Sequence, residues 1–256
     1  MKQTPSSPQA TIKYTPDFTA FLAKLEHPVA IVSPALFEIL GKAVSESRVE
    51  EALQKLGFSE MRAVSFDKHD FTQSLLRESD ISKDNPVFFT ACPLVRNLVT
   101  AEYPRHRQLF SAILPPADRS ALAARKDYPE AALILISPCS ARAEALLPAV
   151  DYIVPLYTIF PALLSLLGLT REALQKNEGY CAASYNHADG SGGRIRVVGS
   201  CPDIRAFFNG FSEGTGTASS SALDSADKKE KPPREAIVEM IACRGGCSEG
   251  DWAPKL

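Results

Sequence analysis

The residues that most clearly suggest chemistry in this 256-residue chain are its six cysteines: Cys92, Cys139, Cys181, Cys201, Cys243 and Cys247. The last two stand four positions apart in the stretch ACRGGCSEG (242–250), with two glycines between them. The first residues lack the apolar segment of a secretory leader, so we expect a cytoplasmic protein. Thiols stay reduced there, and a set of cysteines then binds metal more often than it forms disulfides.

Short apolar runs typical of strands recur along the chain, and four of them come just before cysteines. The runs cover 29–33, 61–66, 87–91, 131–137, 151–155, 194–199 and 236–242. Between them, apolar residues recur at helical spacing over 48–58, 94–103 and 117–128. Strands that alternate with helices predict βαβ units, so we expect an α/β fold with a mainly parallel sheet.

Cys92, Cys139, Cys201 and Cys243 each come one or two residues after the end of a predicted strand. The carboxyl ends of parallel strands converge on the edge where such folds bind ligands. Any one of these cysteines taken alone is better explained as a small buried apolar residue. Four at equivalent positions favour a shared metal site.

The pattern favours an iron–sulfur cluster over zinc. Structural zinc sites use closely spaced CxxC pairs, which this chain lacks, whereas four thiolates from separate loops suit a cluster. Gly245 and Gly246 would let backbone N–H groups approach its sulfurs. Arg142 and Arg244 are close in sequence to candidate ligands, and each is either a hydrogen-bond donor to an anionic cluster or a solvated surface residue.

Three segments, in order, resemble the signature motifs of the iron-only ([FeFe]) hydrogenase large subunit. They are TACPLV (90–95), SPCSARAEA (137–145) and EMIACRGGCSEG (239–250), against the family patterns TSCCPxW, MPCxxKxxE and ExMxCxxGCxxGGGQP. The resemblance covers roughly residues 25–255. It implies two lobes, each a twisted mainly parallel sheet flanked by helices, with the cluster in the cleft between them.

The resemblance places the four ligands of a [4Fe-4S] cluster on Cys92, Cys139, Cys243 and Cys247. In that family the last cysteine also bridges to a two-iron centre with CO and cyanide ligands, and the two parts together form the H-cluster. Cys201 is kept as an additional candidate ligand because it follows a predicted strand.

The departures from the family begin at the first motif. Ala91 replaces the cysteine that relays protons to the two-iron centre, and alanine cannot act as a general acid. Two acidic residues of the family's proton path align with Leu76 and Ser79, while Ser111 keeps its serine. Binding of a four-iron cluster is therefore expected to persist, but efficient hydrogenase chemistry is not.

The other two motifs also differ from the family. Glu144 keeps the glutamate of the second motif, but Arg142 replaces its lysine and Ser137 its methionine. In the third motif Ile241 replaces the methionine, and GDWAP (250–254) stands where the family has GGGQP. A glycine-rich segment that covers the two-iron centre in hydrogenases is missing before residue 194.

Composition and charge exclude some classes of protein and suggest the domain limits. A net charge of −2 and a pI near 6.1 exclude a nucleic-acid-binding surface of the usual basic kind. The uncharged stretch 153–169 contains two prolines and is interpreted as a strand end plus a buried helix, not a membrane span. We expect a flexible lead-in over 1–24, the hydrogenase-like domain over 25–256, and a mobile insertion over 211–234.

Three functions remain open at this stage. The first is a divergent member that senses hydrogen or redox state with slow or no H2 turnover, with a ferredoxin-like or signalling partner and, for a full H-cluster, maturation enzymes. The second is a non-catalytic iron–sulfur scaffold, which the missing cover segment favours. The third, a hydrogenase subunit with its electron-transfer clusters on a partner chain, is disfavoured by Ala91.

Overall fold

The computed structural model separates the chain into two compact units. Unit 1 comprises residues 1–65, 116–181 and 247–256, and unit 2 comprises residues 66–115 and 182–246. The residues that the structure describes are 10–11, 18–41, 44–64, 68–82, 85–141, 149–174, 195–211 and 236–243. Each unit has its own sheet and core, so each is considered by itself.

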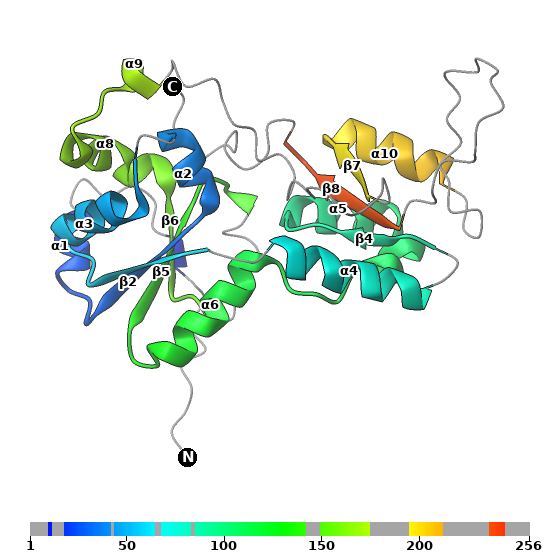
Figure 1. The fold of residues 1–256 in the computed structure, drawn as a ribbon, viewed down its shortest axis with the longest axis horizontal. Coiled ribbons are helices and arrows are strands. Elements are labelled where there is room, and N and C mark those ends of the chain that lie inside the picture. Colours follow the sequence, from blue (N-terminus) through cyan, green and yellow to red (C-terminus); the bar gives the residue numbers. More distant parts are fainter. Residues whose placement is uncertain are drawn as a thin grey trace. The chain divides into compact units, whose positions relative to one another are not determined.

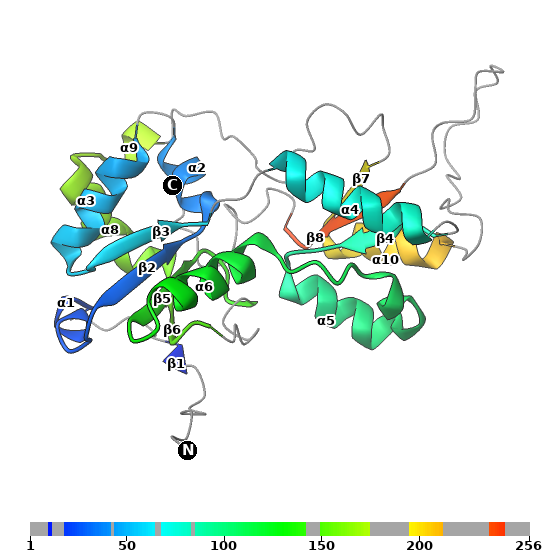
Figure 2. The same ribbon diagram turned by 60° about the horizontal axis from the view of Figure 1, so that its bottom comes forward.

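Unit 1 is built on a parallel sheet (Figure 1) of five strands, which are all labelled in Figure 2 and have the order β1-β6-β5-β2-β3. Its strands are β1 (Ala10–Thr11), β2 (Pro28–Val32), β3 (Glu60–Ala63), β5 (Ala132–Ser137) and β6 (Tyr152–Pro155). All five residues of β2 are buried, as expected for a strand with helices on both faces of its sheet.

The helices of unit 1 cover the two faces of this sheet unequally. One face packs against α1 (Phe18–Leu22), α2 (Pro34–Leu40), α3 (Glu46–Leu56) and α8 (Leu156–Leu167). The other packs against α6 (Pro116–Asp127), which lies along the sheet in Figure 2. The short α9 (Arg171–Leu174) follows α8.

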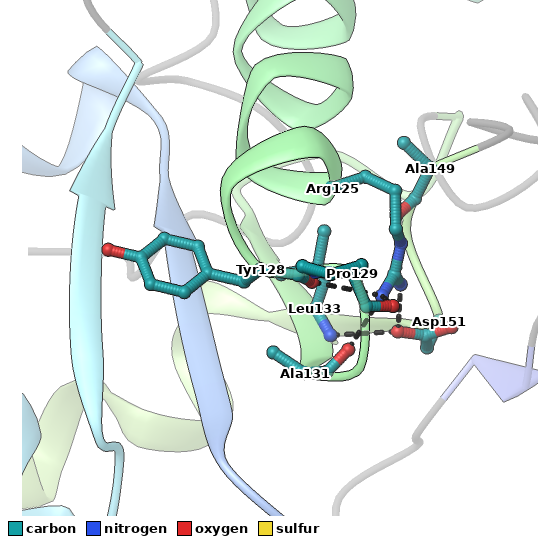
Figure 3. A network of polar contacts seen from close by, with 7 residues as sticks. All are labelled: Arg125, Tyr128, Pro129, Ala131, Leu133, Ala149 and Asp151. Carbon is teal, nitrogen blue, oxygen red and sulfur yellow. Dashed lines mark hydrogen bonds and ion pairs between the residues drawn. The ribbon is translucent and has the colours of Figure 1, made fainter.

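Arg125 joins the end of α6 to the starts of two strands (Figure 3). Its guanidinium donates to the backbone carbonyls of Ala131 at 2.7 Å and Ala149 at 3.2 Å, and pairs with the carboxylate of Asp151. Asp151 in turn accepts from the backbone N–H of Leu133 at 2.8 Å. One side chain thus fixes where β5 and β6 begin.

Unit 2 contains a three-stranded parallel sheet in the order β4-β8-β7. Its strands are β4 (Val87–Phe89), β7 (Ile195–Gly199) and β8 (Ile237–Ile241), and its helices are α4 (Lys68–Ser82), α5 (Pro93–Glu102), η1 (Pro104–Leu109) and α10 (Cys201–Gly210). One face packs on α5 and α10, and α4 covers the other. The first core is strongly aromatic, with Phe88 in edge contact with Phe110, Phe207, Phe208 and Phe211.

The structure confirms the α/β class, with parallel sheets flanked by helices, and each of the seven predicted strands. The predicted helices correspond to α3, α5 and α6, and Gly57 ends α3 with a φ of 111°. The stretch 153–169 forms the end of β6 and the buried α8, as expected. None of the helices that the structure describes is long and apolar enough to cross a membrane.

The elements nearest the N-terminus were not predicted from the sequence. Within residues 1–24, expected to be a flexible lead-in, β1 pairs with β6 and α1 buries Phe18 and Leu22. These elements of two and five residues are too short to give a periodic signal. The predicted insertion at 211–234 lies outside the described residues apart from Phe211, which is buried.

Candidate metal centre

Cys92 lies in a turn that is held by the side chain of a neighbouring residue. The hydroxyl of Thr90, which has 0% exposure, accepts a hydrogen bond from the backbone N–H of Cys92 at 3.0 Å. Cys92 is the N-cap of α5, and Pro93 occupies a first-turn position where no backbone donor is needed. The partial positive charge of the helix N-terminus favours an anionic group at this place.

Two further cysteines follow the other strands of the same sheet. β8 ends at Ile241, and Cys243 comes two residues later; β7 ends at Gly199, and Cys201 comes two residues later. Gly199 and Ile241 are partners in the parallel register, so Cys201 and Cys243 follow equivalent positions on adjacent strands. The sheet of unit 2 therefore brings three cysteines, one from each strand, to its carboxyl edge.

Cys201 differs from Cys92 in that it begins a helix instead of capping one. Ser200 is the N-cap of α10, with a φ of 78°, and its hydroxyl accepts from the backbone N–H of Asp203 at 3.3 Å. Cys201 and Cys92 both pack against the aromatic core beneath α5 and α10. The role of Cys201 as a ligand stays a prediction.

The two helices that start at these turns are also joined by contacts between their side chains. Arg205 of α10 forms a two-point ion pair with Glu102 of α5, at 2.7 and 2.6 Å. The hydrogen bond from Arg205 lowers the pKa of the Glu102 carboxyl, and the pair raises the pKa of the guanidinium. Tyr103 adds a hydrogen bond to Asn209 at 3.1 Å, so α5 and α10 are joined through two pairs of side chains.

Cys139 belongs to unit 1, where it follows β5 by two residues. The buried hydroxyl of Ser137 accepts from the backbone N–H of Cys139 at 3.2 Å and donates to its carbonyl at 3.0 Å. The strand-end position predicted for this cysteine is confirmed. Its strand, however, lies in a different sheet from the strands that carry Cys92, Cys201 and Cys243.

The donor set fits an iron–sulfur cluster in its chemistry. Cys92, Cys139, Cys201 and Cys243 are half-buried thiols, and thiolate sulfur is the usual ligand of such clusters. Within the described part of the chain, no three histidine, cysteine or acidic side chains are close enough together to hold a metal ion. Cys247, Arg142, Glu144, Gly245 and Gly246 lie outside that part, so their assignments stay predictions.

Ala91 lies in the turn between Thr90 and Cys92 and packs against the core beneath α4. The side chain that precedes the candidate ligand is thus a methyl group against apolar residues. It can neither donate nor accept a proton.

A carboxylate that the sequence did not single out lies on α4. Glu78 accepts hydrogen bonds from the hydroxyl of Ser111, which is 3% exposed, and from the backbone N–H of Ala112 at 3.2 Å. The family resemblance aligned its acidic residues with Leu76 and Ser79. The carboxylate that contacts Ser111 is instead Glu78. Glu78 is adjacent to Ser79 on α4, but its contact with Ser111, 33 positions away, leaves no local signal in the sequence.

Parallel sheets with thiols at their carboxyl ends define an α/β protein with a thiolate metal site as its candidate centre. The family model of the iron only hydrogenase large subunit, C-terminal domain, matches residues 26–153, and the chain belongs to that family. The match includes Cys92 and Cys139 and ends before Cys243.

Solved structures agree with this at the level of the fold. One is HydA(deltaEFG), whose structure is described as revealing stepwise [FeFe]-hydrogenase H-cluster assembly; it is 16% identical, with a TM-score of 0.58. Another is a variant of the [FeFe]-hydrogenase HydA1 from Chlamydomonas reinhardtii, which is 17% identical, with a TM-score of 0.57. Each match covers 93% of this chain and 84% of the other. No curated protein matches the chain.

Proposed function

We propose that the chain holds a [4Fe-4S] cluster through the thiolates of Cys92, Cys139, Cys243 and Cys247, and that it senses hydrogen or redox state or transfers electrons, with slow or no H2 turnover. Family membership supports the kind of cofactor. The strand-end positions of Cys92, Cys139 and Cys243 support the donors. When bound, such a cluster supplies a one-electron couple.

The residue that carries the low-turnover part of the proposal is Ala91. H2 activation needs a group that accepts and returns a proton beside the reacting metal, which contributes about 10²–10⁴-fold to rate. The methyl group of Ala91, packed against the core beneath α4, provides no such group. Glu78 and Ser111 are hydrogen-bonded to each other. A proton path through them would still lack its final proton-carrying group, because position 91 is alanine.

The same residues also suit a non-catalytic scaffold, and the two functions differ in one component. A sensor of hydrogen requires the two-iron centre, bridged through Cys247, and therefore the maturation enzymes that build it. A scaffold requires the four-iron cluster alone. For the sensing or electron-transfer function, the partner is a ferredoxin-like electron-transfer protein or a signalling protein, since redox information must leave the chain.

The test is to produce the full chain anaerobically with and without hydrogenase maturation enzymes. Infrared bands of CO and cyanide that appear with maturation, together with a cubane EPR signal, support the sensing proposal. A cubane signal without those bands, lost in Cys139→Ala, favours the scaffold. A chain that takes up neither iron nor sulfide contradicts both. Ser165→Ala, at an exposed position on α8, is the matched control.

A further inference from the structure

We propose that Thr90 is a positioning residue that sets the spacing between the thiolates of Cys92 and Cys243. The idea rests on the proposed function, because it assigns those thiolates to one cluster. The geometry itself belongs to the polypeptide of unit 2, which contains both cysteines and the strands that precede them.

The hydroxyl of Thr90 connects two segments that are 150 positions apart in the sequence. It accepts from the backbone N–H of Cys92 at 3.0 Å and donates to the backbone carbonyl of Met240 at 2.7 Å. Met240 lies in β8, three residues before Cys243. A single oxygen atom therefore connects the turn that carries one candidate ligand to the strand that carries the other.

This bond lies just beyond the point where the backbone pairing of β4 and β8 ends. The last paired residues are Phe89 and Glu239, and Thr90 and Met240 come next on each strand. The Thr90 side chain thus supplies the next hydrogen bond between the two segments, after the last backbone pairing and before the cysteine on each segment. Without it, the two strand ends could separate independently of the sheet below them.

Burial makes the bond a strong constraint. Thr90 has 0% exposure and its bond to Met240 is buried, so water does not compete for that carbonyl. The arrangement needs a side chain that donates and accepts through the same atom, which threonine and serine can do and valine cannot. Loss of the hydroxyl would take away the hydrogen bond of a buried carbonyl and that of a part-buried N–H.

Ser137 provides the comparison within the same chain. Its hydroxyl holds the backbone N–H of Cys139 in the same way, from two positions earlier, but donates to the carbonyl of that same cysteine. The ring that it closes stays inside one turn. Ser137→Ala therefore removes a similar local bond without changing the distance between two ligand-bearing strands.

The deciding measurement is the affinity of the full-length apoprotein for Cd²⁺, which binds thiolates. The background replaces Cys139, Cys181, Cys201 and Cys247 with serine, so that Cys92 and Cys243 are the remaining thiols. Thr90→Val is expected to weaken Cd²⁺ binding by about tenfold to a hundredfold, as substitutions behind metal ligands do. Thr90→Ser should restore it to within about twofold, and Ser137→Ala should leave it unchanged.

Equal affinity in Thr90→Val and its parent would overturn the proposal, as would a parent that binds Cd²⁺ no better than a chain with one thiol. If Thr90→Val does not fold, hydrogen exchange of the parent decides instead. The Cys92 amide should exchange slowly, and exchange at the rate of an unstructured amide counts against the bond.

A second arm separates this proposal from the proposed function. The chain with all its cysteines is loaded with iron and sulfide, and cluster loss to a chelator is followed by EPR. Faster loss in Thr90→Val than in Thr90→Ser supports both ideas. A parent chain that never takes up a cluster contradicts the proposed function, while the Cd²⁺ result still decides the role of Thr90.

Discussion

Ala91 shows how a single side chain can separate cofactor binding from catalysis. It stands between Thr90, which organises the turn, and Cys92, the candidate ligand, and its own methyl group packs against the core beneath α4. The turn therefore keeps its structure whether or not this position can carry a proton. Substitution here can remove acid–base chemistry while it leaves the ligand in place.

We predict that Ala91→Cys raises H2 turnover of the protein matured with hydrogenase maturation enzymes by about a hundredfold or more, the usual contribution of a positioned acid or base. Cysteine is small and apolar enough to take the same contacts. Gas chromatography of H2 at matched iron content measures the effect. Ala91→Ser, a far weaker acid of similar size, is the control, and equal rates for the two variants argue against a missing relay.

Ser111 should matter for stability as well as for chemistry. Its hydroxyl bonds Glu78 and also accepts from the backbone N–H of Ile113 at 3.0 Å. Ser111→Ala leaves these groups short of a partner, and we expect a loss of about 1–3 kcal/mol in the free energy of unfolding. Urea titration measures it.

The matched control is Ser74→Ala on α4. This exposed hydroxyl donates to the backbone carbonyl of Asp70 at 2.8 Å, within its own helix. A change within about 0.5 kcal/mol is expected there. A similarly small change in Ser111→Ala would show that the Glu78 contact does not hold α4 against the rest of unit 2.

Among the helices, α5 and α10 form the layer from which Cys92 and Cys201 emerge, and their ion pair makes that layer sensitive to acid. The hydrogen bond from Arg205 holds the pKa of Glu102 below its ordinary value of 4.5. A carboxyl whose pKa is lower in the folded state contributes stability above the unfolded value. That contribution is lost as the pH falls through the folded value.

We therefore predict that Glu102→Gln is less stable than the parent chain at neutral pH and that the difference shrinks as the pH falls below about 4.5. Midpoints of urea unfolding at a series of pH values test this. Glu130→Gln, a carboxyl in unit 1, controls for loss of charge. A difference that stays constant with pH would contradict the assignment.

Local patterns predicted the elements better than they predicted the pairings. Strands were found because their runs are apolar, and α3 because Gly57 marks its end. α4 was missed because its inward stripe includes the hydroxyls of Thr72 and Ser79, which weaken the apolar period. The pairing of β4 with β8 joins segments about 150 positions apart, and local propensity carries no information about such contacts.

The same limit applies to the candidate site. Strand-end positions of the cysteines followed from where the apolar runs stop, and the structure confirms them for Cys92, Cys139, Cys201 and Cys243. The bonds of Thr90 to β8 and of Ser111 to Glu78 could not be predicted, because each joins segments that meet only through the fold. The sequence around a threonine or serine does not indicate that its hydroxyl will bond to a distant segment.

At the scale of the whole molecule, each unit has its own core and its own means of fixing strand ends. Unit 1 relies on Arg125, whose bonds reach the loop before β5 and the start of β6 (Figure 3). Unit 2 relies on Thr90 and on the pair between α5 and α10. All of these contacts stay within one unit, so damage to one of them should be felt first in that unit.

We predict that Arg125→Met lowers the free energy of unfolding of unit 1 by about 2–3 kcal/mol, because buried carbonyls and Asp151 lose a charged donor. Hydrogen exchange measured by mass spectrometry should show faster exchange in peptides from β5 and β6. Peptides from β4 and β8 should keep the exchange rates of the parent chain. Arg119→Met, an exposed position on the same helix, should change neither set. Faster exchange in both units at once would mean that they unfold as one body, and that Arg125 stabilises the entire chain.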